Sequence, residues 1–291
     1  MKKMLIKKIK YEDEEYPESL RNLSCPPKQL YVIGNEKLLK EKAISIIGSR
    51  VCTKRGEEVA KKFATSLSYA GITIVSGMAR GIDTSAHIGT IDAKGKTIAV
   101  LGAGFKHIFP PENEKLFYRI IDSGGVVVSE YGENVDILPK QFIERNRIVS
   151  GLSLGVFVVE AKTRSGTSIT ANFAKKQGKT VFCLAHGIEE KEGIGTNRLI
   201  KRGAKMVTCP EDIIKELKIN VEIPKIERKT IPIEQVPKEY LPVYKFINKK
   251  PINIDELCKK TKLNISSVSY MLTMLELEGL IKQLPGKNFI R

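Results

Sequence analysis

The sequence predicts an α/β protein with a doubly wound, mostly parallel sheet, followed by a small winged-helix-like module. Short apolar runs rich in β-branched residues recur between residues 43 and 185, and amphipathic segments of helical length separate them. Prolines and charged residues replace this alternation after Leu217. We therefore expect an entry segment packed on the main domain at 1–42, the α/β domain at 43–217, a linker at 218–238 and the C-terminal module at 239–291.

The predicted strands are the runs 43–47, 72–75, 97–101, 126–128, 154–159 and 180–185. Asp83 and Thr167 are residue types that open helices, and we expect each to cap the helix that follows it. Glycines at 71, 95 and 178 come just before strands and are expected to end the preceding helices. The Gly-Lys-Thr triplets that begin at 95 and 178 are therefore interpreted as helix ends, because a P-loop follows a strand and opens a helix.

The C-terminal module is predicted from three helical segments and a terminal hairpin. The segments are 240–248, 254–260 and 265–278, and Pro285-Gly286 forms the turn between two short final runs. The third segment carries hydroxyl groups but no Lys or Arg before residue 278, whereas a helix that reads a DNA groove usually has them. Weak binding of duplex DNA and binding of a protein partner both remain open for this module.

The composition favours a polyanionic partner such as nucleic acid, because 49 Lys and Arg against 33 Asp and Glu give a net charge of +16. No apolar stretch is long enough for a signal peptide or a membrane span, so a cytoplasmic protein with no membrane partner is expected. The five cysteines form no CxxC pair and the three histidines have no ligand spacing, so neither a metal nor a cofactor is predicted. No catalytic triad or carboxylate pair is identifiable, which favours binding over catalysis.

Glycine and arginine follow two of the predicted strands. Gly48, Ser49 and Arg50 come directly after run 43–47, and Arg80 lies in the loop after run 72–75. The carboxyl ends of parallel strands meet at one edge of a sheet, where open α/β folds bind ligands. We expect Gly48 to let the backbone approach a phosphate that Arg50 binds through its forked donors. For Arg80, a solvated or carboxylate-paired side chain is the alternative interpretation.

A basic segment precedes the strand predicted at 154–159. Phe142, Arg145, Asn146 and Arg147 combine an aromatic ring with cations, as binding of single-stranded nucleic acid requires. A helical conformation of this segment would instead place Phe142 in the core, and this alternative stays open.

A loop of small residues follows the same strand and opens a helix. Its residues Arg164, Ser165, Gly166 and Thr167 bring backbone N–H groups, hydroxyls and the helix dipole towards one point, where an anion can bind. An ordinary turn capped by Ser165 or Thr167 is the alternative.

Residues 11–217 resemble the DNA-processing protein family DprA, also called Smf. The resemblance is carried by CPPKQLY (25–31), IIGSR (46–50), SGMARGIDTSAH (76–87), FIERNRI (142–148) and EAKTRSGTSIT (160–170). The chain departs from the family where Lys54-Arg55-Gly56 replaces a tyrosine before the glycine and where Ala185-His186-Gly187 replaces Pro-Gly. Both departures put the shape of the affected loop in doubt.

The resemblance implies an extended Rossmann-like domain that binds single-stranded DNA without hydrolysing it. It further implies a homodimer that helps load the recombinase RecA during natural transformation, without indicating residues for either contact. The DNA-binding residues carried over by position are Gly48, Ser49, Arg50, Phe142, Arg145, Asn146, Arg147, Ser165, Gly166 and Ser168. Together with Arg80 and Arg164, they form the predicted DNA-binding site.

Two other functions remain as alternatives. The strand, loop and helix around Gly166-Thr167 resemble the PGGxGTxxE loop of lysine-decarboxylase-like phosphoribohydrolases, which process nucleotides. However, Arg164-Ser165 replaces the leading Pro-Gly, and the glutamate needed for acid–base catalysis is absent. A DNA-binding adaptor in defence or repair is the second alternative.

Overall fold

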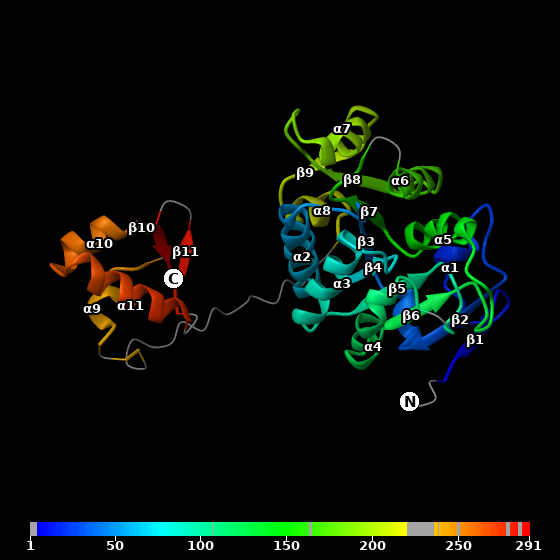
Figure 1. The fold of residues 1–291 in the computed structure, drawn as a ribbon, viewed down its shortest axis with the longest axis horizontal. Coiled ribbons are helices and arrows are strands. Elements are labelled where there is room, and N and C mark those ends of the chain that lie inside the picture. The colour runs from blue at the N-terminus through cyan, green and yellow to red at the C-terminus, as the bar shows by residue number, and fades with distance from the viewer. Residues whose placement is uncertain are drawn as a thin grey trace. The chain divides into compact units, whose positions relative to one another are not determined.

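The computed structural model describes residues 5–106, 108–162, 165–219, 236–237, 239–248, 251–277, 280–284 and 287–291. The chain forms two compact units, Met1–Ile223 and Pro224–Arg291 (Figure 1). Most of the linker predicted at 218–238 lies outside the described residues, as does Arg164 of the predicted DNA-binding site.

The larger unit contains a nine-stranded, mostly parallel sheet, which confirms the predicted fold class. The strand order in the described residues is β1-β2-β6-β5-β4-β3-β7-β8-β9. β1 pairs antiparallel with β2 and β2 with β6, whereas the other pairs are parallel. Because β3 neighbours both β4 and β7, the winding direction reverses between β3 and β7, and this position is the topological switch point. The strands are β1 (Lys7–Lys10), β2 (Gln29–Gly34), β3 (Ala43–Ile47), β4 (Thr73–Ser76), β5 (Thr97–Leu101), β6 (Val126–Ser129), β7 (Gly155–Val158), β8 (Thr180–Leu184) and β9 (Lys205–Val207).

Helices cover both faces of this sheet (Figure 1). Ile44 and Ile46 of β3 belong to a core formed with α2 and α3, while Ala43 and Ile47 belong to the core beneath α5 and α6. This alternation is what a strand buried on both faces requires. Among the described helices, none combines the length and apolar character needed to cross a membrane. The helices are α1 (Glu18–Arg21), α2 (Lys54–Tyr69), α3 (Ile82–Asp92), α4 (Glu114–Asp122), α5 (Pro139–Gly151), α6 (Gly166–Lys176), α7 (Ile194–Lys201) and α8 (Pro210–Glu216), with 3₁₀ turns η1 (Glu36–Lys40), η2 (Pro111–Asn113) and η3 (Lys191–Gly193).

Three predicted helix boundaries are wrong in detail. Gly81, rather than Asp83, is the cap residue of α3, because the Asp83 carboxylate accepts hydrogen bonds from the preceding loop. Ser165, rather than Thr167, is the cap residue of α6. After α3, Lys94 takes the left-handed conformation expected of Gly95, with φ of 56°.

The C-terminal unit is a winged helix, as predicted. Its described helices pack on a three-stranded antiparallel sheet of order β10-β12-β11. The first helix is shorter than the predicted 240–248, because the N–H groups of Phe246 and Ile247 bond to carbonyls three residues back and tighten the last turn. The elements are α9 (Leu241–Tyr244), β10 (Ile252–Asn253), α10 (Ile254–Thr261), α11 (Ile265–Leu277), β11 (Lys282–Leu284) and β12 (Asn288–Ile290).

Candidate nucleic-acid interface

Two adjoining cavities lie at the carboxyl ends of the central strands. The first, of about 340 Å³, is at the topological switch point, between the segments that follow β3 and β7. The second, of about 270 Å³, shares Arg50, Val51, Gly77, Ala79 and Arg145 with the first. We call the two cavities together the carboxyl-edge groove. Predicted site residues that line the groove are Gly48, Ser49, Arg50, Arg80, Phe142, Arg145, Asn146, Ser165 and Gly166.

The turn after β3 is anchored on both sides of Arg50. The Ser49 hydroxyl donates to the Val51 carbonyl at 2.6 Å, so it stabilises the turn. Thr53 caps α2 and donates its hydroxyl and N–H to the buried Glu160 carboxylate at 2.5 and 3.1 Å. The Arg50 side chain is exposed, and no ion pair found among the described residues involves it. Arg50 is therefore an available cation on a fixed turn.

Arg145 forms part of the floor of the groove and is not an exposed cation on its rim. Its side chain on α5 is buried, with the residue 4% exposed, and its guanidinium donates to the carbonyls of Gly77 and Val100, at the ends of β4 and β5. The neighbouring Asp83 carboxylate accepts the N–H groups of Gly77 and Ala79 at 3.0 and 3.3 Å. Arg145 and Asp83 therefore hold the strand-end turns in place.

Burial sets the pKa values of this charged pair. Desolvation lowers the pKa of Arg145 to about 10, although the Asp83 charge acts in the opposite direction. Desolvation also raises the pKa of Asp83, against the effect of Arg145 and the two backbone donors. Only glycine fits at position 77, because a Cβ there would lie 2.8 Å from both the Arg145 Cζ and an Asp83 oxygen.

The structure separates the three consecutive residues that the sequence groups together on α5. Asn146 lines the groove and its amide donates to the Gly166 carbonyl at 3.4 Å. Arg147 lines neither cavity and binds the Glu130 carboxylate through two hydrogen bonds of 2.7 and 2.8 Å. Successive residues on a helix point about 100° apart, since a turn takes 3.6 residues. The three side chains therefore face different surroundings.

The N-terminal end of α6 opens onto the groove. Gly166 is exposed there, and the Thr167 hydroxyl donates to the Gly48 carbonyl at 3.0 Å, which fixes the helix end against the turn after β3. Ser168 does not line either cavity, but its hydroxyl lies 3.5 Å from that of Ser165. The positive end of the α6 dipole and its first backbone N–H groups are suited to a phosphate.

An aromatic pair forms the second cavity of the groove. The half-buried Phe142 ring packs against the backbone of Gly102 and lies 5.2 Å from the Phe109 ring, centroid to centroid. Phe109 itself is 44% exposed. Phe142 thus contacts the core and also lines the groove. Arg80 lies on the same rim, where it is exposed and paired with Glu112.

Two residues that line the groove, Lys162 and Phe109, and one that supports a neighbouring loop, Asn113, were not identified from the sequence. Lys162 is exposed and lines the first cavity, and its place just before the glycine loop was an available signal. Phe109 had no signal, because it meets Phe142 only in the folded chain. Asn113 donates to the Met78 carbonyl at 2.9 Å and thereby supports a residue in the left-handed region, with φ of 61°.

His87 lies near the groove but does not open onto it. Its Nδ1 is 2.8 Å from the Thr97 hydroxyl, and its Nε2 has no hydrogen-bond partner among the described residues. Burial, followed by the nearby Arg145 charge, lowers the pKa of His87 to about 3. The imidazole is therefore neutral at physiological pH and contributes no positive charge for binding DNA.

Comparison with known proteins assigns the chain to a family. The chain matches the family of DNA recombination-mediator protein A over residues 7–218 and the DprA winged helix domain over residues 227–287. It is 40% identical to DNA processing protein DprA of Streptococcus pneumoniae over 204 residues, covering 70% of this chain and 72% of that protein. It is 34% identical to Protein Smf of Escherichia coli over 282 residues, covering 96% and 75% of the two chains.

Two solved structures share the fold of the larger unit. The X-ray structure of DprA from S. pneumoniae superposes with a TM-score of 0.69 at 38% identity, covering 72% of this chain and 74% of that one. DprA from Helicobacter pylori, studied for its single-stranded DNA binding mode, superposes with a TM-score of 0.67 at 30% identity, covering 75% and 98%. The chain belongs to the DNA recombination-mediator protein A family.

Proposed function

We propose that the carboxyl-edge groove binds single-stranded DNA. The observation that carries this proposal is the convergence of Arg50, Lys162 and the N-terminal end of α6 on one cavity, next to a second cavity with two aromatic rings. Cations that follow a phosphate backbone, combined with rings on which bases stack, are the two components of single-strand binding. The single-stranded DNA binding mode of the related H. pylori protein supports the same assignment.

The residues of the groove have distinct proposed roles. Arg50 and Lys162 pair with phosphates, because both side chains are exposed at the cavity and neither takes part in an ion pair found in the described residues. Asn146, Ser165 and Gly166 offer hydrogen bonds beside them. Phe142 and Phe109 provide the stacking surface, whereas Arg145 positions the turns from beneath. Ser168 and Arg147 are assigned no direct contact in this arrangement.

We also propose that the groove binds DNA without hydrolysing it. Asp83 is the one carboxylate among the described residues that line the groove, and it is buried with two backbone donors and Arg145 beside it. A general base must reach the proton that it abstracts, and this carboxylate instead stabilises the loop. A single-stranded oligonucleotide should therefore stay intact on incubation with the protein, and nucleoside monophosphates should release no free base. Such release would support the phosphoribohydrolase alternative.

We propose further that the protein acts as a homodimer that helps load RecA on single strands during transformation and recombination. The family description, DNA recombination-mediator protein A, supports a role beside a recombinase. RecA filament assembly on protein-coated single strands should accelerate when the chain is added, and light scattering should give twice the chain mass. An unchanged assembly rate would favour a defence or repair adaptor.

The winged helix is assigned an auxiliary binding role. The exposed positions of α11 include Ile265 and Tyr270, at 53% and 60% exposure, and the α11 sequence has no Lys or Arg. This surface suits a protein partner better than the phosphates of duplex DNA. Gel shifts with duplex DNA, using the full chain and a chain ending at Leu217, test this assignment.

The central test measures affinity for a labelled oligothymidylate by fluorescence anisotropy. Replacing Arg50 with alanine should weaken binding about 10- to 100-fold, as loss of a hydrogen bond to a charged group implies. Arg119→Ala is the matched control, because Arg119 is an exposed arginine on α4 that lines neither cavity of the groove. Equal losses in the two variants would exclude Arg50 as a specific contact.

A further inference from the structure

A second group of cations lies at the amino-terminal edge of the sheet, opposite the groove. A pocket of about 470 Å³ is formed there by the last turns of α6, the start of β8 and the α7–β9 turn. Among the described residues, its lining contains Lys175, Lys179, Arg202 and Lys205 but no carboxylate. We call this the amino-edge pocket.

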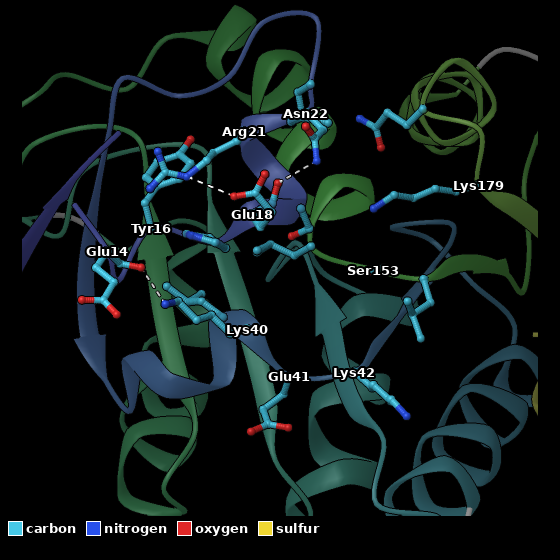
Figure 2. Close-up of a pocket in the computed structure, with 17 residues that line it drawn as sticks. Glu14, Tyr16, Glu18, Arg21, Asn22, Lys40, Glu41, Lys42, Ser153 and Lys179 are labelled. Carbon is cyan, nitrogen blue, oxygen red and sulfur yellow. Dashed lines mark hydrogen bonds and ion pairs between the residues drawn. The ribbon is translucent and has the colours of Figure 1, made fainter. Parts of the chain in front are cut away.

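A larger cavity next to it, of about 1010 Å³, differs in its charge balance (Figure 2). The two cavities share Lys179, but the larger one also contains carboxylates. Its Arg21 pairs with Glu18 at 3.3 Å, and its Lys40 donates to the Glu14 carbonyl at 2.6 Å. Arg21 and Lys40 already have partners, and an anion in this cavity would also meet the carboxylates in its lining.

The four cations of the amino-edge pocket are not equally available. Lys179 is half-buried, donates to the carbonyls of Ser150 and Gly151 at the end of α5, and has a pKa lowered by burial to about 8. Lys205 pairs with Glu216 at 3.2 Å, but both side chains are exposed, and such pairs are weak. Lys179 therefore stabilises the fold, and Lys205 can exchange its partner for a phosphate.

Lys175 and Arg202 are the available cations. Both are exposed, and neither takes part in an ion pair found in the described residues. The glycines beside them leave the pocket open, because a Cβ on Gly178 or Gly203 would meet no atom within 4 Å. Two free cations and one weakly paired cation thus surround an unobstructed pocket without a competing carboxylate in its lining.

The helix α6 connects this pocket to the groove. Ser165 and Gly166 at its beginning line the groove, while Ala171, Asn172 and Lys175 line the amino-edge pocket. Eleven residues at 1.5 Å each make α6 about 16 Å long. A strand of several nucleotides that leaves the groove can therefore reach the pocket along α6.

We propose that the amino-edge pocket binds phosphates of a second segment of single-stranded DNA. The choice of ligand rests on the proposed function of the groove, whereas the pocket is a separate site on the same chain. The protein then holds two segments of strand, one at each edge of the sheet. Phosphate contacts of this kind carry no sequence information. The second site therefore increases the affinity and fixes the position of the strand on the protein, without preferring any base.

The test is the stoichiometry of a short oligothymidylate on the full chain, measured by calorimetry at low salt. The oligothymidylate has about four nucleotides, which is the shortest length that a single-strand binding site usually takes. One oligonucleotide should therefore fill one site. The wild-type chain should bind two. The double variant Lys175→Ala with Arg202→Ala should bind one, and Arg50→Ala should bind one at wild-type affinity and the second about 10- to 100-fold more weakly.

The matched control replaces Lys176 and Lys201 with alanine. Both are exposed, are the last residues of α6 and α7, and do not line the pocket. This control removes the same charge from the same helix ends and should still bind two. One site on the wild-type chain, or an equal loss in the control and the double variant, would overturn the proposal. If Arg50→Ala keeps two sites of unchanged affinity while the double variant loses one, the proposed role of Arg50 fails and the amino-edge pocket stands.

Discussion

Removing the buried Arg145 guanidinium should mainly destabilise the larger unit, and it should not remove a direct contact with DNA. Arg145→Met keeps a long side chain but removes the donor from the carbonyls of Gly77 and Val100. It also leaves the buried Asp83 carboxylate without its neighbouring positive charge. The variant should therefore lose folding stability and the fixed position of the turns, since Arg145 itself is only 4% exposed.

The size of the effect follows from the burial of both partners. Arg145 and Asp83 interact as neighbouring buried charges rather than through a direct ion pair. Removing one of two interacting buried charges lowers the free energy of unfolding by about 3–5 kcal/mol, because the remaining charge is uncompensated. For a unit of this size, each kcal/mol shifts the Tm by about 2–4 °C. The Arg145→Met variant should therefore melt about 6–20 °C below the wild-type chain.

Differential scanning calorimetry measures this shift, and a double-mutant cycle with Asp83→Asn tests its cause. The double variant should recover part of the lost stability, because it no longer buries an uncompensated carboxylate. A Tm within about 2 °C of wild type, together with a clear loss of single-strand affinity, would refute the reasoning. Arg145 would then act as a direct DNA contact.

Three further outcomes are expected. The stability of the wild-type chain should fall by up to about 1.4 kcal/mol per pH unit as the pH drops from about 6.5 towards 3, because unfolded His87 takes up a proton that the folded form, with a pKa of about 3, cannot bind. Urea unfolding at pH 7 and 5 should show less of this slope for His87→Met, and an unchanged slope would contradict the assignment. Gly77→Ala should lower the free energy of unfolding by about 1–3 kcal/mol, because the added Cβ would press on Arg145. Gly166→Ala is the control and should unfold in urea like wild type, because a Cβ there meets no atom within 4 Å. Equal stability of the two variants would argue against close packing around Gly77. Phe142→Ala should weaken oligothymidylate binding in anisotropy by about 1–3 kcal/mol, and Phe142→Tyr should preserve it, if bases stack on this ring.

The strand pattern was readable because both faces of the sheet are buried. The runs 43–47 and 97–101 coincide with β3 and β5, since all but one residue of each run is apolar and every residue of both strands is buried. The position of the groove was readable for a related reason. Turns rich in glycine and cations follow strands of the sheet, and the carboxyl ends of parallel strands lie at one edge of a sheet. The switch point between β3 and β7 brings the turns after these two strands together.

The roles within the groove depended on contacts that are remote in the sequence. Arg145 and Arg147 look equivalent in the sequence, but one reaches carbonyls at the ends of β4 and β5 and the other reaches Glu130. The helical rotation of α5 decides between these environments, and no local pattern gives that rotation. Phe109 was missed because it meets Phe142 across 33 positions of sequence.

The amino-edge pocket had no sequence signal at all. Lys175 and Arg202 each follow the ordinary preference for cations near helix C-termini. Only the parallel pairing of β8 with β9 brings the two helix ends to one pocket.

The most direct test of single-strand binding by the groove is the salt dependence of oligothymidylate affinity for the wild-type, Arg50→Ala and Arg119→Ala chains. The logarithm of the affinity should fall linearly with the logarithm of the salt concentration, and the slope should be shallower by about 0.7 for each phosphate that the protein no longer neutralises. Arg50→Ala should show this shallower slope and Arg119→Ala should keep the wild-type slope. A flat salt response, or identical slopes for all three chains, would contradict binding of the DNA backbone in the groove.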